Sequence, residues 1–179
     1  MPTGILSSFP DNFDAPMPEF NADGMLDPGD YAPTRAEFED RFVNFGDSAR
    51  RQSIYGGWNR HRNALLEAGV PDSSQQLLNG SFTMSKPSPG DIDRVVEVPV
   101  DDETLFSLDE AHAVVKLLQG PLMKSAYHCE AYPIFSLPPD HSLYERITAE
   151  AIRYWTKWFG QTRNLTPKGR VWATTGGLP

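Results

Sequence analysis

The residues of this chain best suited to chemistry are a glycine-serine pair followed, after nine intervening residues, by two aspartates. Gly80-Ser81 precede Asp91-Ile92-Asp93, which enter a valine-rich segment that we expect to form a strand. Side chains alternate between the faces of a strand, so Asp91 and Asp93 should point the same way. Mg²⁺ prefers oxygen ligands and is commonly held by one or two carboxylates together with water and phosphate oxygens. The spacing therefore predicts a site for Mg²⁺ or Mn²⁺ beside a nucleoside triphosphate.

The turn that precedes the acid pair is suited to phosphate. Gly80 lets the backbone approach a phosphate without a Cβ in the way, and Ser81 adds a hydroxyl and a backbone N–H. Lys86 lies in the loop that follows, and Lys168 lies near the C-terminus. Either lysine could neutralise phosphates, and either also suits a solvated position. Gly80, Ser81, Lys86 and Lys168 are the predicted nucleotide-binding residues.

Periodicity and capping signals predict the elements that must position these residues. A capping box at Thr34 and Glu37 predicts the start of a helix, and a longer helix is expected over 48–68, weakened at Gly56-Gly57. Further helices are expected over 107–118 and 141–159, and strands over 75–78, 92–100, 126–135 and, at a sheet edge, 167–174. This order predicts an α/β or α+β fold, a mixed sheet with flanking helices.

Two ranges of the chain differ in character. Residues 1–33 contain six prolines and apolar residues with no helical or strand period, so we expect an extended N-terminal arm laid on the body, with the first ten residues disordered. Residues 34–179 are expected to form a single domain.

Net charge limits the classes of partner. A charge of -8 and a pI of about 4.9 argue against sequence-independent affinity for nucleic acid, which depends on many Lys and Arg side chains. A nucleotide or a protein is the easier substrate. The one locally basic stretch, Arg50 to Arg62, is interpreted as a solvated helix face.

Other classes are excluded by what the sequence lacks. No apolar stretch approaches the roughly 18 residues that span a bilayer, and no signal peptide is recognisable, so we expect a cytoplasmic protein without a membrane partner. One cysteine, Cys129, and four scattered histidines give neither an internal disulfide nor zinc-ligand spacing. The aromatic run from Tyr154 to Phe159 could stack on a base, although its helical spacing is more typical of a core.

The glycine-serine pair, the nine-residue gap and Asp91-Ile92-Asp93 resemble the signature of the DNA polymerase beta-type nucleotidyltransferase superfamily. Most of the chain also resembles an uncharacterised family of short bacterial and phage proteins assigned to that superfamily. The matching residues are Phe20-Asn21, Gly24, Leu26, Pro28-Gly29, Ala36 to Phe42, Gly80 to Thr83, Lys86, Pro89, Asp91 to Asp93 and Pro167 to Gly169.

The resemblance implies a nucleotidyltransferase-like fold and a transferase that moves a nucleoside monophosphate from a triphosphate such as ATP to a hydroxyl, releasing pyrophosphate. It also implies a third carboxylate on a later strand, for which Glu130 is the best match. Asp91, Asp93 and Glu130 are then the catalytic residues and metal ligands. Two departures from the pattern are this glutamate, where aspartate is commoner, and Arg94, where a hydrophobic residue usually follows the pair.

Two alternatives to an enzyme of this kind remain open. One is a nucleotide-binding or partner-binding module without turnover. The other is a component of a toxin-antitoxin or phage-defence system that acts on a protein or tRNA. The acceptor itself could be a protein, a small molecule or RNA.

Overall fold

A five-stranded mixed sheet forms the centre of the protein. The computed structural model describes residues 17–100 and 108–178, and within them the strand order is β1-β5-β2-β3-β4. The strands are β1 (Asp30–Tyr31), β2 (Gln75–Asn79), β3 (Ile92–Pro99), β4 (Cys129–Ser136) and β5 (Arg170–Thr174). β2 is antiparallel to both of its neighbours, whereas β3 and β4 are parallel, as are β1 and β5.

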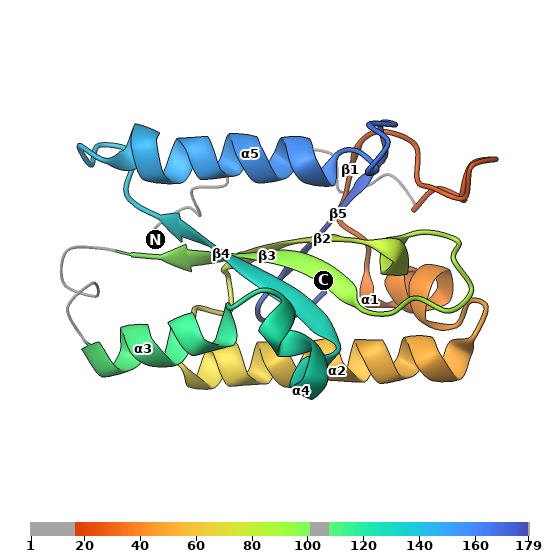
Figure 1. The fold of residues 1–179 in the computed structure, drawn as a ribbon, viewed down its shortest axis with the longest axis horizontal. Helices are drawn as coiled ribbons and strands as arrows, with labels where there is room; N and C mark the ends of the chain where they lie inside the picture. The colour runs from red at the N-terminus through yellow and green to blue at the C-terminus, as the bar shows by residue number, and fades with distance from the viewer. Residues whose placement is uncertain (1–16, 101–107, 179) are drawn as a thin grey trace.

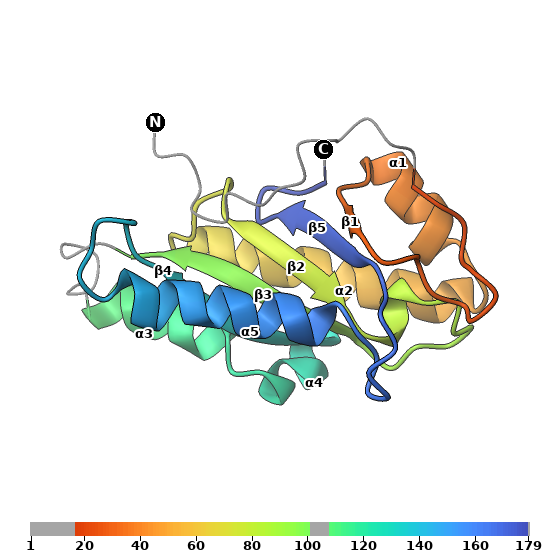
Figure 2. The ribbon, with the colours of Figure 1, turned by 90° about the horizontal axis from the view of Figure 1, so that it is seen from above.

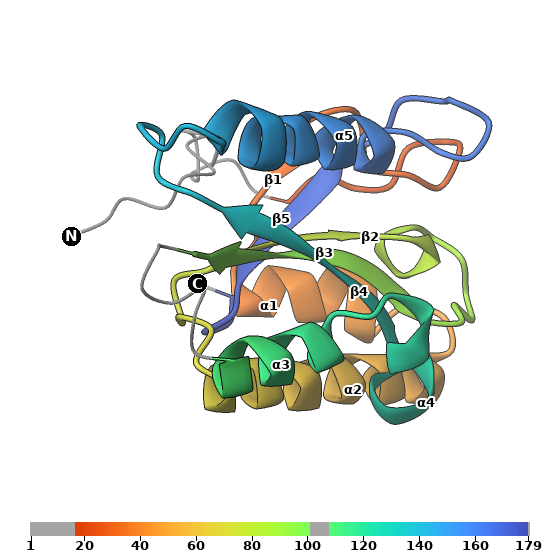
Figure 3. The same cartoon turned by 60° about the vertical axis from the view of Figure 1, so that its left-hand side comes forward.

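Helices cover both faces of this sheet (Figure 1). One face carries α5 (Glu150–Phe159), which continues a π-helical segment over Glu145–Ala149. The other carries the long α2 (Ser48–Glu67), α3 (Leu108–Leu117) and α4 (Lys124–Tyr127), and the two layers stand clearly apart in Figure 3. Near the start of α2 lie α1 (Arg35–Phe38) and a π-helical segment over Glu39–Val43 (Figure 2). The predicted mixed sheet with flanking helices is confirmed.

Strand alternation divides the core into two layers. Ile92 and Val96 of β3 pack in the cluster that includes Ile54 and Trp58 of α2. Val95, the intervening residue, packs instead in the cluster of the α5 face. Asp93 has the same parity as Val95, so the strand that builds the core also directs this carboxylate to the α5 face.

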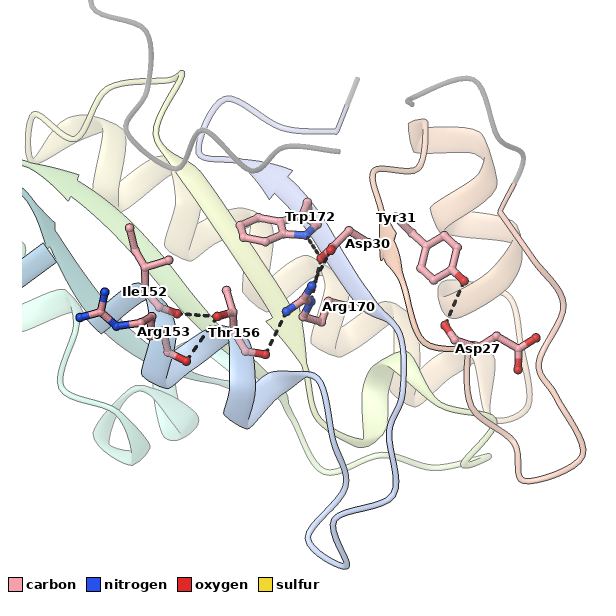
Figure 4. A network of polar contacts seen from close by, with 8 residues as sticks. All are labelled: Asp27, Asp30, Tyr31, Ile152, Arg153, Thr156, Arg170 and Trp172. Atoms are coloured by element: carbon pink, nitrogen blue, oxygen red, sulfur yellow. Dashed lines mark hydrogen bonds and ion pairs between the residues drawn. The ribbon is translucent and has the colours of Figure 1, made fainter. Parts of the chain in front are cut away.

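The prediction of an edge strand over 167–174 is wrong. β5 begins at Arg170 and lies between β1 and β2, because the end of the predicted arm supplies an outer strand. The Asp30 carboxylate of β1 pairs with the Arg170 guanidinium, whose Nε donates at 2.7 Å, and accepts from Trp172 Nε1 at 2.7 Å (Figure 4). Arg170 also donates to the carbonyl of Thr156, which ties this corner to α5.

Helix boundaries follow the predictions in part. The capping box at Thr34 and Glu37 is confirmed, and the helix predicted over 48–68 is α2. The strand predicted over 126–135 begins only at Cys129, because α4 and a left-handed His128 precede it. Ser107, where the helix over 107–118 is predicted to begin, and the first ten residues lie outside the described residues. In the described ranges, no helix is long and apolar enough to cross a bilayer.

The interpretation of the basic stretch from Arg50 to Arg62 as a solvated face is wrong for three of its five basic residues and holds for Arg60, which is exposed. Arg51, His61 and Arg62 are buried. They are accommodated because backbone carbonyls supply partners: Arg62 Nε donates to Thr175 at 2.9 Å, and His61 Nε2 lies 2.6 Å from the oxygen of Leu117. The side chains of Arg51, His61 and Arg62 thus pack between α2 and its neighbours, and this helix exposes less positive charge than its sequence suggests.

The glycine pair in α2 does not interrupt the helix. A Cβ at Gly57 would lie 2.2 Å from the carbonyl oxygen of Tyr127 and 3.3 Å from Cβ of His128, the residues that join α4 to β4. At Gly56 the nearest atom would be the end of the Arg60 side chain at 3.7 Å. Gly57 therefore lets the backbone before β4 approach α2 closely, whereas Gly56 has room for a side chain.

This pair gives a matched test of the packing. Gly57→Ala should lower the free energy of unfolding by about 1–3 kcal/mol, because the new methyl group overpacks against a backbone carbonyl. Gly56→Ala should raise it by about 0.5–1 kcal/mol, because alanine favours helix and its methyl group would meet only the end of the Arg60 side chain, without a clash. Urea unfolding followed by circular dichroism measures both. Equal effects of the two substitutions would contradict this packing of α2 against the α4–β4 junction.

Candidate functional site

Three carboxylates converge on the α5 face of the sheet. Asp91 directly precedes β3, Asp93 lies within it, and Glu130 lies opposite Asp93 on the parallel strand β4. One oxygen of each carboxylate lies within 4.8 Å of those of the other two. The convergence expected from strand alternation is confirmed. The role of these residues as metal ligands stays a prediction.

A lysine that the sequence analysis missed bridges two of the acids. Lys124 Nζ of α4 lies 2.8 Å from Asp91 Oδ2 and 2.5 Å from Glu130 Oε1. Tyr132 donates its hydroxyl proton to Glu130 Oε2 at 2.6 Å. Burial alone would raise the pKa of Glu130, but the hydrogen bonds from Lys124 and Tyr132 lower it overall. Glu130 is therefore held as a carboxylate.

Asp93 is the acid whose charge is least well compensated. Burial, followed by the charges of Asp91 and Glu130, raises the pKa of Asp93 to about 6, against the opposing charges of Lys124 and Lys168. Near neutral pH the cluster thus carries more negative charge than its two lysines offset. Three oxygen donors with a residual negative charge fit a hard divalent cation such as Mg²⁺ or Mn²⁺.

The glycine turn is shaped around this same acid. Gly80 has a φ of 83°, and a Cβ on it would lie 2.2 Å from Asp93 Oδ2. Asn79, which faces Asp93 in the β2–β3 register, accepts from the Gly80 N–H at 2.7 Å and donates to the Phe159 carbonyl at 3.0 Å. Gly80 is therefore required for a second reason, in addition to the predicted approach to phosphate: it makes room for a carboxylate.

Arginines of α2 hold the loop between the glycine turn and the acid pair. The buried Arg51 guanidinium donates to backbone carbonyls at 2.6–2.8 Å, those of Phe42, Phe82, Met84 and Lys86. Burial lowers the pKa of Arg51 to about 10, so it stays charged at neutral pH. Arg50 donates to the carbonyls of Pro89 and Gly90. The loop that carries Ser81 and Lys86 is thus fixed from the α2 side.

The two predicted phosphate-binding lysines differ in placement. Lys168 is buried and its Nζ donates to Asn79 Oδ1, beside Asp93. Burial lowers the pKa of Lys168 to about 8, although Asp93 opposes the shift. Lys86 is exposed, and the contact that the structure shows for it is its carbonyl, held by Arg51. Ser81 starts a 3₁₀ turn, Ser81–Thr83, directly after Gly80. The structure therefore brings Lys168, rather than Lys86, to the acids.

The missed residues differ in how far sequence could have found them. Tyr132 lies two positions after Glu130 in a strand, so alternation alone places it on the same face. Asn79 ends the strand that precedes the glycine turn. Lys124 lies in a four-residue helix whose sequence gives no sign that it packs beside β3.

Comparison with known proteins places the chain in a family. The model of DUF6932, a family of unknown function, matches residues 18–174, and the chain belongs to this family. No curated protein and no solved structure shows detectable similarity to this chain.

The raised pKa of Asp93 predicts a pH dependence of stability in the metal-free protein. The folded pKa of about 6 exceeds the ordinary value of 3.8, so the folded state binds more protons and loses stability as pH rises through this range. The loss between pH 5 and 7 should be about 1–2 kcal/mol. In EDTA, Asp93→Asn should remove this component and melt at least as high as wild type at pH 7.

The matched control is Asp140→Asn, because Asp140 is exposed. Differential scanning calorimetry from pH 5 to 7 should show the same slope for this variant as for wild type. If Asp93→Asn melts several degrees below wild type in EDTA at pH 7, the carboxylate holds the fold together through hydrogen bonds, and the interpretation as a charged cluster is wrong.

Proposed function

We propose that this member of DUF6932 is a metal-dependent nucleotidyltransferase that moves a nucleoside monophosphate from a nucleoside triphosphate to a hydroxyl acceptor. The observation that carries the proposal is the convergence of Asp91, Asp93 and Glu130 on one sheet face, with an uncompensated charge on Asp93. The glycine turn abuts this cluster, since Gly80 lies against Asp93. Acids and a phosphate-binding turn in contact are what such a reaction requires.

Each group of the site has a role in this proposal. Asp91, Asp93 and Glu130 hold Mg²⁺, which supplies positive charge to the phosphate oxygens when it is bound. The backbone N–H groups and hydroxyl of Gly80-Ser81 hold the phosphates. Lys168 adds a cation through its contact with Asn79 of β2, whereas Lys124 contacts Glu130 of β4, on the other side of β3. Tyr132 keeps Glu130 oriented through its hydrogen bond.

The chemical step is a displacement at the α-phosphorus. The acceptor oxygen bonds to the α-phosphorus, the bond between that phosphorus and the oxygen bridging to the β-phosphorus breaks, and pyrophosphate leaves with the electron pair. The hydroxyl proton passes to a carboxylate of the cluster. Little covalent chemistry falls to the protein, because positioning and charge stabilisation supply most of the catalysis of phosphoryl transfer.

One observation favours a second function, a nucleotide- or partner-binding module without turnover. Lys124 Nζ already bridges Asp91 and Glu130, at 2.8 and 2.5 Å, and so satisfies part of the charge that a metal would. In a binding module this ion-pair network would be retained when the ligand binds. In the transferase, Lys124 must give up at least one of these contacts.

Labelled triphosphates separate these functions. The full-length protein is incubated with Mg²⁺, host lysate and ATP or another triphosphate that carries its label on either the α- or the γ-phosphate. A transferase should give a larger product that retains the α-label and never the γ-label. Loss of a residue that merely hydrogen-bonds to a metal ligand costs about 10- to 100-fold in activity. Asp93→Asn removes a ligand itself, so it should reduce the transfer rate by more than that. Asp140→Asn should leave the rate unchanged.

Each other outcome excludes the proposal in a different way. Transfer of the γ-label would identify a kinase. Absence of any transfer, together with a nucleotide-dependent rise in melting temperature, would identify the binding module.

A further inference from the structure

The segment around α5 has a charge opposite to that of the whole chain. Residues 141–170 contain six Lys and Arg but two Glu, whereas the chain carries a net charge of -8. The exposed cations of this segment are Arg146, Arg153, Lys157 and Arg163. Arg153 pairs with Glu145 at 2.8 Å, so the others provide most of the free positive charge. The basic surface lies here, and not on α2, where sequence alone had placed it.

Two large aromatic side chains lie beside these cations and face outward. Tyr154 is 58% exposed and Trp158 is 50% exposed. They are one helical turn apart, as are Arg153 and Lys157, so an aromatic pair and a cationic pair run side by side along α5. The prediction that the aromatic run belongs to the core is therefore wrong for these two residues and holds for Phe159, which is buried.

Aromatic contacts connect this surface to the acid cluster. The ring centroids of Tyr154 and Trp155 are 5.1 Å apart, and those of Trp155 and Tyr132 are 4.9 Å apart. Tyr132 is the hydrogen-bond donor to Glu130. At the end of α5, the Phe159 carbonyl accepts from Asn79. The charge of Arg163, in the loop that follows, acts on Glu130. Figure 2 shows α5 running over the sheet toward the end where β3 begins.

We propose that the outer face of α5, with Tyr154, Trp158, Lys157 and Arg163, binds single-stranded RNA and presents its terminal hydroxyl to the acid cluster. The inference rests on the proposed nucleotidyl transfer and names its acceptor. Exposed aromatic rings stack on unpaired bases, and neighbouring cations pair with the phosphates between them. RNA exposes such bases at its ends and loops, where proteins recognise them by stacking.

The same surface disfavours a duplex. Bases in a duplex are stacked on each other and offer no free face to Tyr154 or Trp158. The acidic remainder of the chain repels a long polyanion, and four exposed cations neutralise few phosphates. The expected slope of log K against log salt is about -2 to -3 for a single strand. The bound RNA segment should therefore be short, and the affinity should depend moderately on salt concentration.

Fluorescence anisotropy with a labelled 12-nucleotide single-stranded RNA tests this surface directly, in EDTA and without nucleotide. Wild type should bind, and Trp158→Ala or Tyr154→Ala should weaken binding by about 5- to 100-fold, because each removes a stacking partner. Lys157→Gln should make the salt slope shallower by about 0.7. Leu122→Ala and Lys116→Gln are the controls, since both residues are exposed and lie outside the α5 face.

The result that would overturn the inference is equal binding by wild type and Trp158→Ala, or no binding by wild type. Equal affinity for single-stranded DNA or for duplex RNA of the same sequence would overturn the assignment to single-stranded RNA. The melting-temperature rise with Mg²⁺ and nucleotide is measured on the same protein preparations, in separate samples without EDTA. If wild type binds RNA but shows no melting-temperature rise, the proposed function alone is refuted. If wild type shows the melting-temperature rise but does not bind RNA, the RNA surface alone is refuted.

Discussion

The burial of Asp93 beside two other carboxylates is the constraint on which the rest of the site depends. Parallel pairing of β3 with β4 places Glu130 opposite Asp93, and alternation adds Asp91 on the same face. Burial, together with the charges of Asp91 and Glu130, disfavours ionisation of Asp93 and raises its pKa. The surrounding residues either offset that charge, as Lys124 does, or make room for it, as Gly80 does.

The strand that carries Asp93 also holds a buried cation on the opposite face of the sheet. Arg94, beside Asp93 in sequence, is buried on the α2 face and donates to Gln76 Oε1 at 2.7 Å. The same oxygen accepts from Trp58 Nε1 at 3.0 Å, so β2, β3 and α2 share one polar contact. The presence of arginine at this position, where the sequence resemblance leads one to expect a hydrophobic residue, thus has a structural counterpart. Gln76 provides an acceptor for one nitrogen of this buried guanidinium, whereas its Nε and Nη2 have no hydrogen-bond partner among the described residues.

Much of this arrangement could be predicted from sequence because it is local. Capping at Thr34, the extent of α2 and the alternation of Asp91 and Asp93 depend on residues a few positions apart. The predictions that were wrong concern features set by contacts between distant segments. β5 is an inner strand because Asp30 of β1 pairs with Arg170. Arg51 is buried because four backbone carbonyls of two other segments accept its hydrogen bonds. Lys124 reaches the acids through tertiary packing that no local pattern encodes.

The central claim is that the three acids form a divalent metal site, and direct titration with Mn²⁺ followed by electron paramagnetic resonance tests it most simply. Wild type should bind Mn²⁺, and more tightly when a non-hydrolysable triphosphate is present, because phosphate oxygens complete the coordination of the ion. Asp93→Asn should weaken binding by at least about tenfold, since removal even of an outer-shell partner costs 10- to 100-fold in metal affinity. Asp140→Asn should bind as wild type does. Equal binding of Mn²⁺ by wild type and Asp93→Asn would contradict the account.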